Sequence, residues 1–179
     1  MTFDPKAYGP AVAAILGDGT RLMPLGPGTP DESKRKLLAS FDPQCDLPNV
    51  KNADAAKACL AGLWLYWDFL DESHAISQDL HTAEGSAWHA IMHRREPDAG
   101  NSKYWWKRVG PHPFIAALRD VESRYSSPSA FVDFCERVRG KGNDEEAVAQ
   151  QIQLREWQIL FDDCFQRAVG FNPTVFRRS

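Results

Sequence analysis

An apolar stripe with helical spacing begins at residue 56 and predicts the central helix of the protein. Its members recur every three or four residues and so share one helical face: Ala56, Leu60, Leu63, Trp67 and Leu70. A second stripe near the C-terminus has the same period: Leu154, Trp157, Phe161, Cys164 and Ala168. No run of alternating apolar and polar residues indicates a β-sheet. The pattern therefore predicts an all-α protein.

Capping and helix-breaking residues predict the other helices of this core. Thr82 can cap a helix that runs to about residue 95, because its hydroxyl can accept a free backbone N–H of the first turn. A further helix is expected over 99–109, and another begins at Pro113, whose fixed φ suits a first helical turn. The segment 126–129 introduces a helix that ends at about Arg139, before the last helix.

The first fifty residues differ from the rest because glycine and proline interrupt them often. Only short helices, around 6–16 and 31–41, are expected there. We interpret residues 1–50 as an arm packed over a helical core of residues 53–170. The expected architecture is a single-domain, irregular helical bundle with a Pro/Gly-rich N-terminal arm.

Composition supports a globular protein and narrows its partners. The 179 residues are 43% hydrophobic and 25% charged, which is typical of one domain with a buried core. The net charge of -3 gives no overall attraction to nucleic acid or to anionic membranes. The four cysteines lack metal or redox spacing, and no stretch reaches the roughly 20 apolar residues of a membrane span. We expect a soluble, cytoplasmic protein with no membrane partner and no nucleic-acid partner.

All five histidines lie between residues 74 and 112, which makes this segment the candidate site. Continuing the central apolar stripe by four residues reaches His74, and four more reach Gln78. On the following helix, spacings of four and three place His89, His93 and Glu96 on one face. An antiparallel hairpin that turns near residues 81 and 82 would place His74 opposite His89, and Asp71 opposite His93.

Three interpretations of this histidine group remain open. A divalent transition metal could be held by His74, His89, His93 and Glu96, since imidazole and carboxylate are suitable ligands. Alternatively, His89 and His93 could act as metal-free general acids or bases, with Asp71, Glu96 or Asp98 orienting a ring; Glu96 and Asp98 are then further candidate catalytic residues. The third interpretation is a structural network of buried histidines. The sequence lacks the glutamate of H-E-x-x-H, having Ala90 in that position.

Basic, aromatic and amide side chains follow the histidine pair and could bind a small polar or anionic molecule. The candidate ligand-binding residues are Gln78, Arg94, Asn101, Tyr104, Trp105 and His112. Cationic and aromatic groups of this kind hold anionic, ring-containing ligands through charge-assisted hydrogen bonds and stacking. Asn101 could instead cap a helix, and His112, held between two prolines, could either enter the site or cap the helix that follows.

The same segment resembles a family of uncharacterised bacterial and fungal proteins. The shared string is W-H-A-I-M-H-R-R-E-P-D at 88–98, continued by Asn101, Tyr104, Trp105, Gly110, His112 and Pro113. The signature has the form W-H-x-I-M-H-R-x-E-x-D-x-x-N-x-x-Y-W, and the resemblance covers about 40 residues. It supports the choice of segment and implies no particular reaction.

The sequence thus leaves three classes of function open. The leading one is a small-molecule-binding or enzymatic protein with a histidine-rich pocket that can hold a metal. The others are a non-catalytic module that binds an anionic metabolite or partner, and a structural or interaction protein with a buried histidine network.

Overall fold

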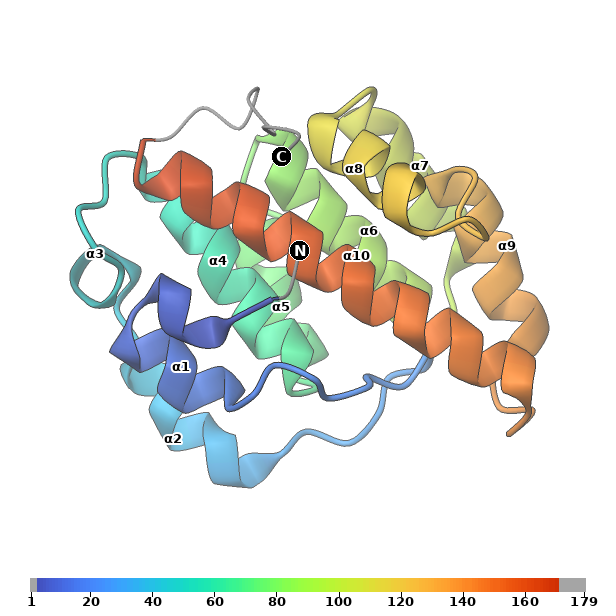
Figure 1. Cartoon of the computed structure of the whole chain (residues 1–179), viewed down its shortest axis with the longest axis horizontal. Helices are drawn as coiled ribbons and strands as arrows, with labels where there is room; N and C mark the ends of the chain where they lie inside the picture. Colours follow the sequence, from blue (N-terminus) through green and yellow to red (C-terminus); the bar gives the residue numbers. More distant parts are fainter. Residues whose placement is uncertain (1–2, 171–179) are drawn as a thin grey trace.

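Helices α4 (Ala53–Tyr66) and α10 (Asp144–Ala168) pack against each other and carry most of the two apolar stripes (Figure 1). The computed structural model describes residues 3–170, and this range contains no β-strand. The prediction of an all-α helical bundle is confirmed. The remaining helices, in chain order, are η1 (Pro5–Tyr8), α1 (Pro10–Leu16), α2 (Glu32–Ser40), α3 (Pro43–Asp46), α5 (Leu70–Ser77), α6 (Ala83–Arg95), α7 (Ala99–Val109), α8 (Pro113–Val121) and α9 (Pro128–Val138).

Close contact between helices at the centre depends on a small residue in α4. Gly62 lets the indole of Trp88 on α6 approach so closely that an added Cβ would lie 2.7 Å from Trp88 Cζ2. The carbonyl of Gly62 also accepts a 2.9 Å hydrogen bond from Nε1 of Trp157 on α10. Both tryptophans are fully buried. Since aromatic side chains bury more apolar surface than other residues, this three-helix junction is a principal part of the core.

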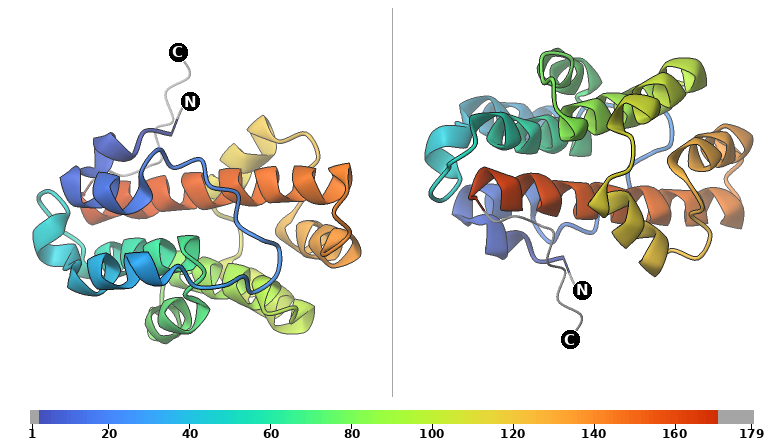
Figure 2. Two further views of the ribbon diagram at one scale, coloured as in Figure 1. Left: turned by 90° about the horizontal axis from the view of Figure 1, so that it is seen from below. Right: turned by 90° about the horizontal axis from the view of Figure 1, so that it is seen from above.

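The N-terminal arm connects two layers of helices (Figure 2). One layer contains α10 and α1, the other contains α2, α4 and α6, and the blue segment after α1 crosses between them. Core side chains bind the backbone of this crossing segment. Gln153 Nε2 donates to the carbonyls of Met23 and Pro24, and Arg95 donates to those of Gly26 and Pro27. The arm is therefore held by hydrogen bonds from the interior as well as by apolar packing.

One prediction about the central helix is wrong. The stripe suggested a helix running from residue 53 beyond Leu70, but α4 ends at Tyr66 and α5 begins at Leu70. Asp68 between them has a positive φ of 67°, which interrupts the helix. Its buried carboxylate pairs with Arg95 and Arg21, each at 2.5 Å. These long-range ion pairs stabilise a turn that local periodicity does not reveal.

The other predicted boundaries agree with the structure. Thr82 caps α6 through a 3.1 Å hydrogen bond from the backbone N–H of Gly85. Helices α7, α8 and α9 lie where the positions of glycine and proline in the sequence predicted them. The short α3, capped by Asp42, was not predicted. Of the four cysteines, all unpaired, Cys59, Cys135 and Cys164 are buried and Cys45 is exposed. None of the described helices combines the length and apolarity needed to span a membrane.

Candidate functional site

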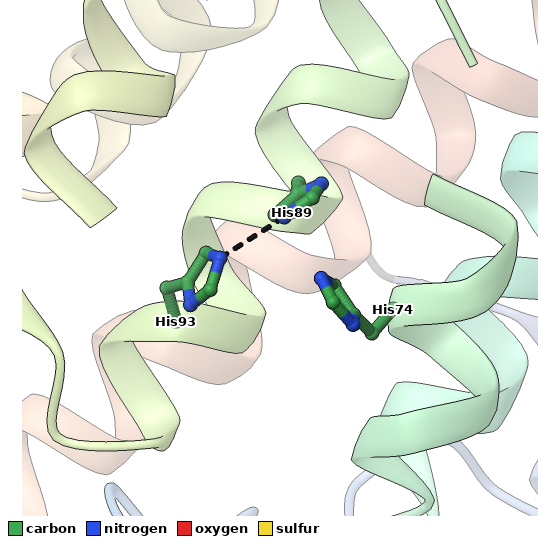
Figure 3. Close-up of side chains that lie close together, drawn as sticks. All are labelled: His74, His89 and His93. Atoms are coloured by element: carbon green, nitrogen blue, oxygen red, sulfur yellow. Dashed lines mark hydrogen bonds between the residues drawn. The ribbon is translucent and has the colours of Figure 1, made fainter. Parts of the chain in front are cut away.

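Three imidazole rings converge between α5 and α6. His74 comes from α5, and His89 and His93 come from successive turns of α6 (Figure 3). One ring nitrogen from each lies within 4.8 Å of the other two, and Nε2 of His89 is 3.0 Å from Nε2 of His93. The ring centroids of His74 and His89 are 4.7 Å apart, which bears out the predicted opposition of these two residues. We call these three residues the histidine triad.

Glu96 contacts the triad through the ring nitrogen of His93 that is not directed at His89. Its Oε2 lies 3.0 Å from Nδ1 of His93, the nitrogen that points away from His89. Because a carboxylate only accepts hydrogen bonds, Nδ1 of His93 carries the proton in the neutral ring, and its Nε2 then presents a lone pair to the triad. Glu96 thus orients His93, while the nitrogens that converge belong to the three histidines.

His89 is the most enclosed member of the triad, with 3% of its surface exposed. Trp105 of α7 stacks on its ring with centroids 4.0 Å apart and an interplanar angle of 17°, so the ring is fixed by stacking. Its Nδ1 is buried and has no hydrogen-bond partner among residues 3–170. Burial, and next the charges of His93 and His74, lower the pKa of His89 to about 4. His89 is therefore neutral at physiological pH, the form in which imidazole binds metals.

The chain matches no known protein-family model, and no curated protein or solved structure is significantly similar to it. The geometry of the site therefore carries the functional argument. The string at 88–98 supplies two members of the triad and Glu96, so the segment chosen from the sequence does contain the converging side chains.

Arg94, expected to bind a ligand, contacts α10 and not the triad. It is fully buried and forms a 2.6 Å ion pair with Glu156 of α10, which is also fully buried. Its guanidinium additionally lies 4.6 Å from the ring centroid of Phe131. Arg94 therefore links α6 to α10 inside the core and is not accessible to a ligand. This corrects the prediction made from its position next to His93.

The remaining candidates lie around α7 with different roles. Asp98 caps α7 by accepting a 3.0 Å hydrogen bond from the backbone N–H of Asn101. The amide of Asn101 donates to the other oxygen of Asp98 at 2.7 Å, so Asp98, and not Asn101, is the cap. Hydrogen bonds from the backbone and then the side chain of Asn101 lower the pKa of Asp98.

Tyr104 is 53% exposed and contacts the edge of Trp105. Gln78 is exposed at the end of α5, and Asp71, expected opposite His93, is exposed and forms no hydrogen bond or ion pair with it. Of the aromatic and amide residues in the prediction, Trp105 is thus the one that contacts a triad ring.

His112 belongs to a second cluster, with residues that the sequence reasoning missed. Its Nδ1 accepts the backbone N–H of Phe114 at 3.4 Å, so it caps α8, and its Nε2 lies 3.2 Å from Glu84 of α6. Asp163 of α10 completes a group of three potential metal ligands. No local spacing connects Glu84 with residue 163, so the sequence does not predict this cluster.

An arginine already occupies the centre of this second cluster. Nε of Arg167 lies 2.8 Å from Glu84 and 2.7 Å from Asp163, and its Nη2 lies 3.3 Å from Nε2 of His112. A guanidinium here supplies the positive charge that a metal ion would supply. The histidine triad has no such internal cation within hydrogen-bonding distance in the described chain, and it is the better candidate metal centre.

Proposed function

We propose that His74, His89 and His93 bind one divalent transition metal ion. The protein would use this ion to activate a water molecule for attack on a small polar substrate. The observation that carries this proposal is the convergence of three imidazole nitrogens within 4.8 Å, two of them 3.0 Å apart. Nitrogens bound to one tetrahedral zinc ion lie about 3.3 Å apart, because each Zn–N bond is about 2.0 Å. The His89–His93 distance is close to that value, and the nitrogen of His74, within 4.8 Å of the other two, would have to move closer by rotation of its ring.

Three features of the surroundings support a metal over a simple histidine network. Glu96 orients the ring of His93 from outside, an arrangement in which a carboxylate fixes the tautomer of a ligand and makes it more basic. His89 is neutral near pH 7. Three protein ligands also leave one tetrahedral position for water, as in catalytic zinc sites.

The chemistry proposed for this position is that of a metal-bound water. A bound divalent metal lowers the pKa of its water to about 7, which supplies hydroxide for hydrolysis or hydration at neutral pH. His74 and His93 are partly exposed, so an ion bound by the triad would lie near solvent. A reducing, cytoplasmic location agrees with four cysteines that form no disulfide.

A metal-free acid–base site is the second candidate, and one contact favours it. If Nε2 of His89 carries a proton, it can donate to Nε2 of His93 at 3.0 Å, and Glu96 then completes a chain of three groups. Such a chain could move a proton between the enclosed His89 and the exposed carboxylate of Glu96. This alternative requires no ion and predicts activity in the presence of chelators.

Metal analysis of protein purified without a polyhistidine tag tests the proposal. We expect about one equivalent of metal after reconstitution with Zn²⁺ or Co²⁺, and Co²⁺ should give the visible absorption of a tetrahedral site. His74→Ala and His89→Ala should lose this metal. His81→Ala is the matched control, because His81 is exposed and outside the triad, and it should retain full binding. Equal metal content in all variants, or none in the parent, would refute the metal site.

A further inference from the structure

A pocket of about 490 Å³ lies among α7, α8 and α9, separate from the histidine triad. Its wall includes residues from the end of α7, the turn into α8, and the beginning of α9. The volume falls within the roughly 300–1,000 Å³ range of small-molecule sites. Consecutive residues on α7 contribute to the histidine triad and to the pocket, since Trp105 stacks on His89 and Trp106 lines the pocket.

The charged side chains of this pocket are all basic. Lys107 and Arg119 line it, together with His112, and no aspartate or glutamate does. Within residues 3–170, neither Lys107 nor Arg119 forms a salt bridge or a side-chain hydrogen bond. Most other arginines of this region are paired, as Arg94 is with Glu156 and Arg139 with Glu136. Two uncompensated cations therefore face one concave surface in a chain of net charge -3.

Most of the rest of the wall is apolar. Trp106 and Ile115 are buried residues that line the pocket, and three prolines, Pro111, Pro113 and Pro128, restrict its backbone. Trp106 is only 4% exposed, and its indole Nε1–H has no hydrogen-bond partner in the described part of the chain. A buried donor without a partner is unusual in a folded protein and is often completed by water or a ligand.

We infer that this pocket binds a small organic anion, a carboxylate or phosphate ester with an apolar body. Lys107 and Arg119 would neutralise the anionic group through charge-assisted hydrogen bonds, and Trp106 with the prolines would contact the apolar body. His112 has no free ring nitrogen for catalysis, because both are engaged by Glu84 and by the backbone of Phe114. The pocket is therefore a binding site, and its ligand is distinct from the substrate of the triad.

Two aromatic anions and one neutral analogue test this assignment on the full chain. Phenyl phosphate and benzoate are the probes, and benzamide is the uncharged control of similar size. Binding is followed in ¹H–¹⁵N spectra through the indole N–H of Trp106, assigned with Trp106→Phe, and the backbone N–H of Gly110. We expect both anions to shift these signals in a saturable way, and benzamide to bind at least ten times more weakly. Whichever anion binds more tightly identifies the preferred head group.

Charge-removing variants decide whether the pocket cations are responsible. The double variant Lys107→Gln/Arg119→Gln should weaken binding of both anions at least tenfold and leave the rest of the spectrum unchanged. The matched control is Lys141→Gln/Arg137→Gln, which removes two exposed charges that do not line the pocket. Unchanged affinity in the pocket variant, or equal binding of benzamide, would overturn the inference. Metal content is measured in parallel. If no metal were found at the histidine triad, the result for the anion pocket would still stand.

Discussion

Nε2 of His89 and Nε2 of His93 lie 3.0 Å apart, one helical turn from each other on α6. At this distance something positive must lie between the two nitrogens, either a shared proton or a metal ion, because two bare lone pairs repel. The outer nitrogen of His93 is bound by Glu96, whereas that of His89 is buried without a partner in the described chain. The two rings therefore differ in how their orientation is fixed, and this difference can be tested at Glu96.

Glu96→Gln should weaken metal binding without abolishing it. The amide can still contact Nδ1 of His93, but it lacks the charge that makes the imidazole a stronger ligand. Loss of such an outer carboxylate typically lowers metal affinity about 10- to 100-fold. Competition with a chromogenic chelator measures the dissociation constant. Glu32→Gln, an exposed glutamate in α2, is the control and should leave affinity unchanged. An unaltered constant in Glu96→Gln would show that the carboxylate has no part in the metal site.

The sequence located the triad because the relationship within it is mostly local. His89, His93 and Glu96 follow helical spacing, and the cap at Thr82 fixed the start of their helix. His74 was placed opposite His89 by assuming a hairpin. This placement is correct although the predicted continuous helix is in fact divided into α4 and α5. Helix α5 is a separate segment after the turn at Asp68, yet it still directs His74 toward α6.

Residues whose role depends on distant partners could not be assigned in this way. Arg94 sits between His93 and Arg95 in the sequence, but its neighbour in space is Glu156, 62 positions away. An arginine beside a candidate site looks the same in sequence whether it faces solvent or the core. The Glu84–His112–Asp163 cluster is likewise assembled from three helices whose packing no short motif encodes. Both cases require the tertiary arrangement of α6 and α10.

Arg94→Met should destabilise the fold strongly. It leaves Glu156 fully buried without its countercharge, and breaking a buried pair from one side typically costs about 3–5 kcal/mol. Urea unfolding followed by tryptophan fluorescence measures the change. Arg94→Met/Glu156→Leu removes both charges and should recover a large part of the loss. Arg137→Met, at an exposed arginine, should change stability by less than about 0.5 kcal/mol. A double variant no more stable than Arg94→Met would contradict this account of the pair.

Gly62→Ala should destabilise the protein by about 1–3 kcal/mol, because its new methyl group would overlap Trp88 Cζ2 at 2.7 Å. Trp88 is fully buried and cannot move away easily. Thermal unfolding by circular dichroism measures the effect. In α7, Gly100→Ala is the comparison: its Cβ would meet only Asp98 Oδ1 at 3.6 Å, an ordinary contact. This change should stabilise the protein by about 0.4–1 kcal/mol through the unfolded state. Equal effects at both positions would exclude a steric role for Gly62.

The second cluster should make stability depend on pH in the acid range, through Glu84. Burial raises the pKa of this carboxyl, but the hydrogen bond from His112 and the charge of Arg167 outweigh burial and lower it from 4.5 to about 2. A depressed pKa in the folded state means that the stabilisation is complete above pH 4.5 and disappears as the pH falls toward 2. Asp163 in the same cluster acts in the opposite sense, because burial raises its pKa.

Comparison of the parent with Glu84→Gln isolates the contribution of Glu84 from that of Asp163. Between pH 5 and 2.5 the parent should lose about 2–3 kcal/mol more unfolding free energy than the variant, since a shift of one pKa unit corresponds to about 1.4 kcal/mol. Urea unfolding at several pH values provides the two profiles. Glu145→Gln, an exposed glutamate on α10, should follow the parent. Parallel profiles for the parent and Glu84→Gln would mean that Arg167 and His112 do not hold Glu84 ionised in the folded state.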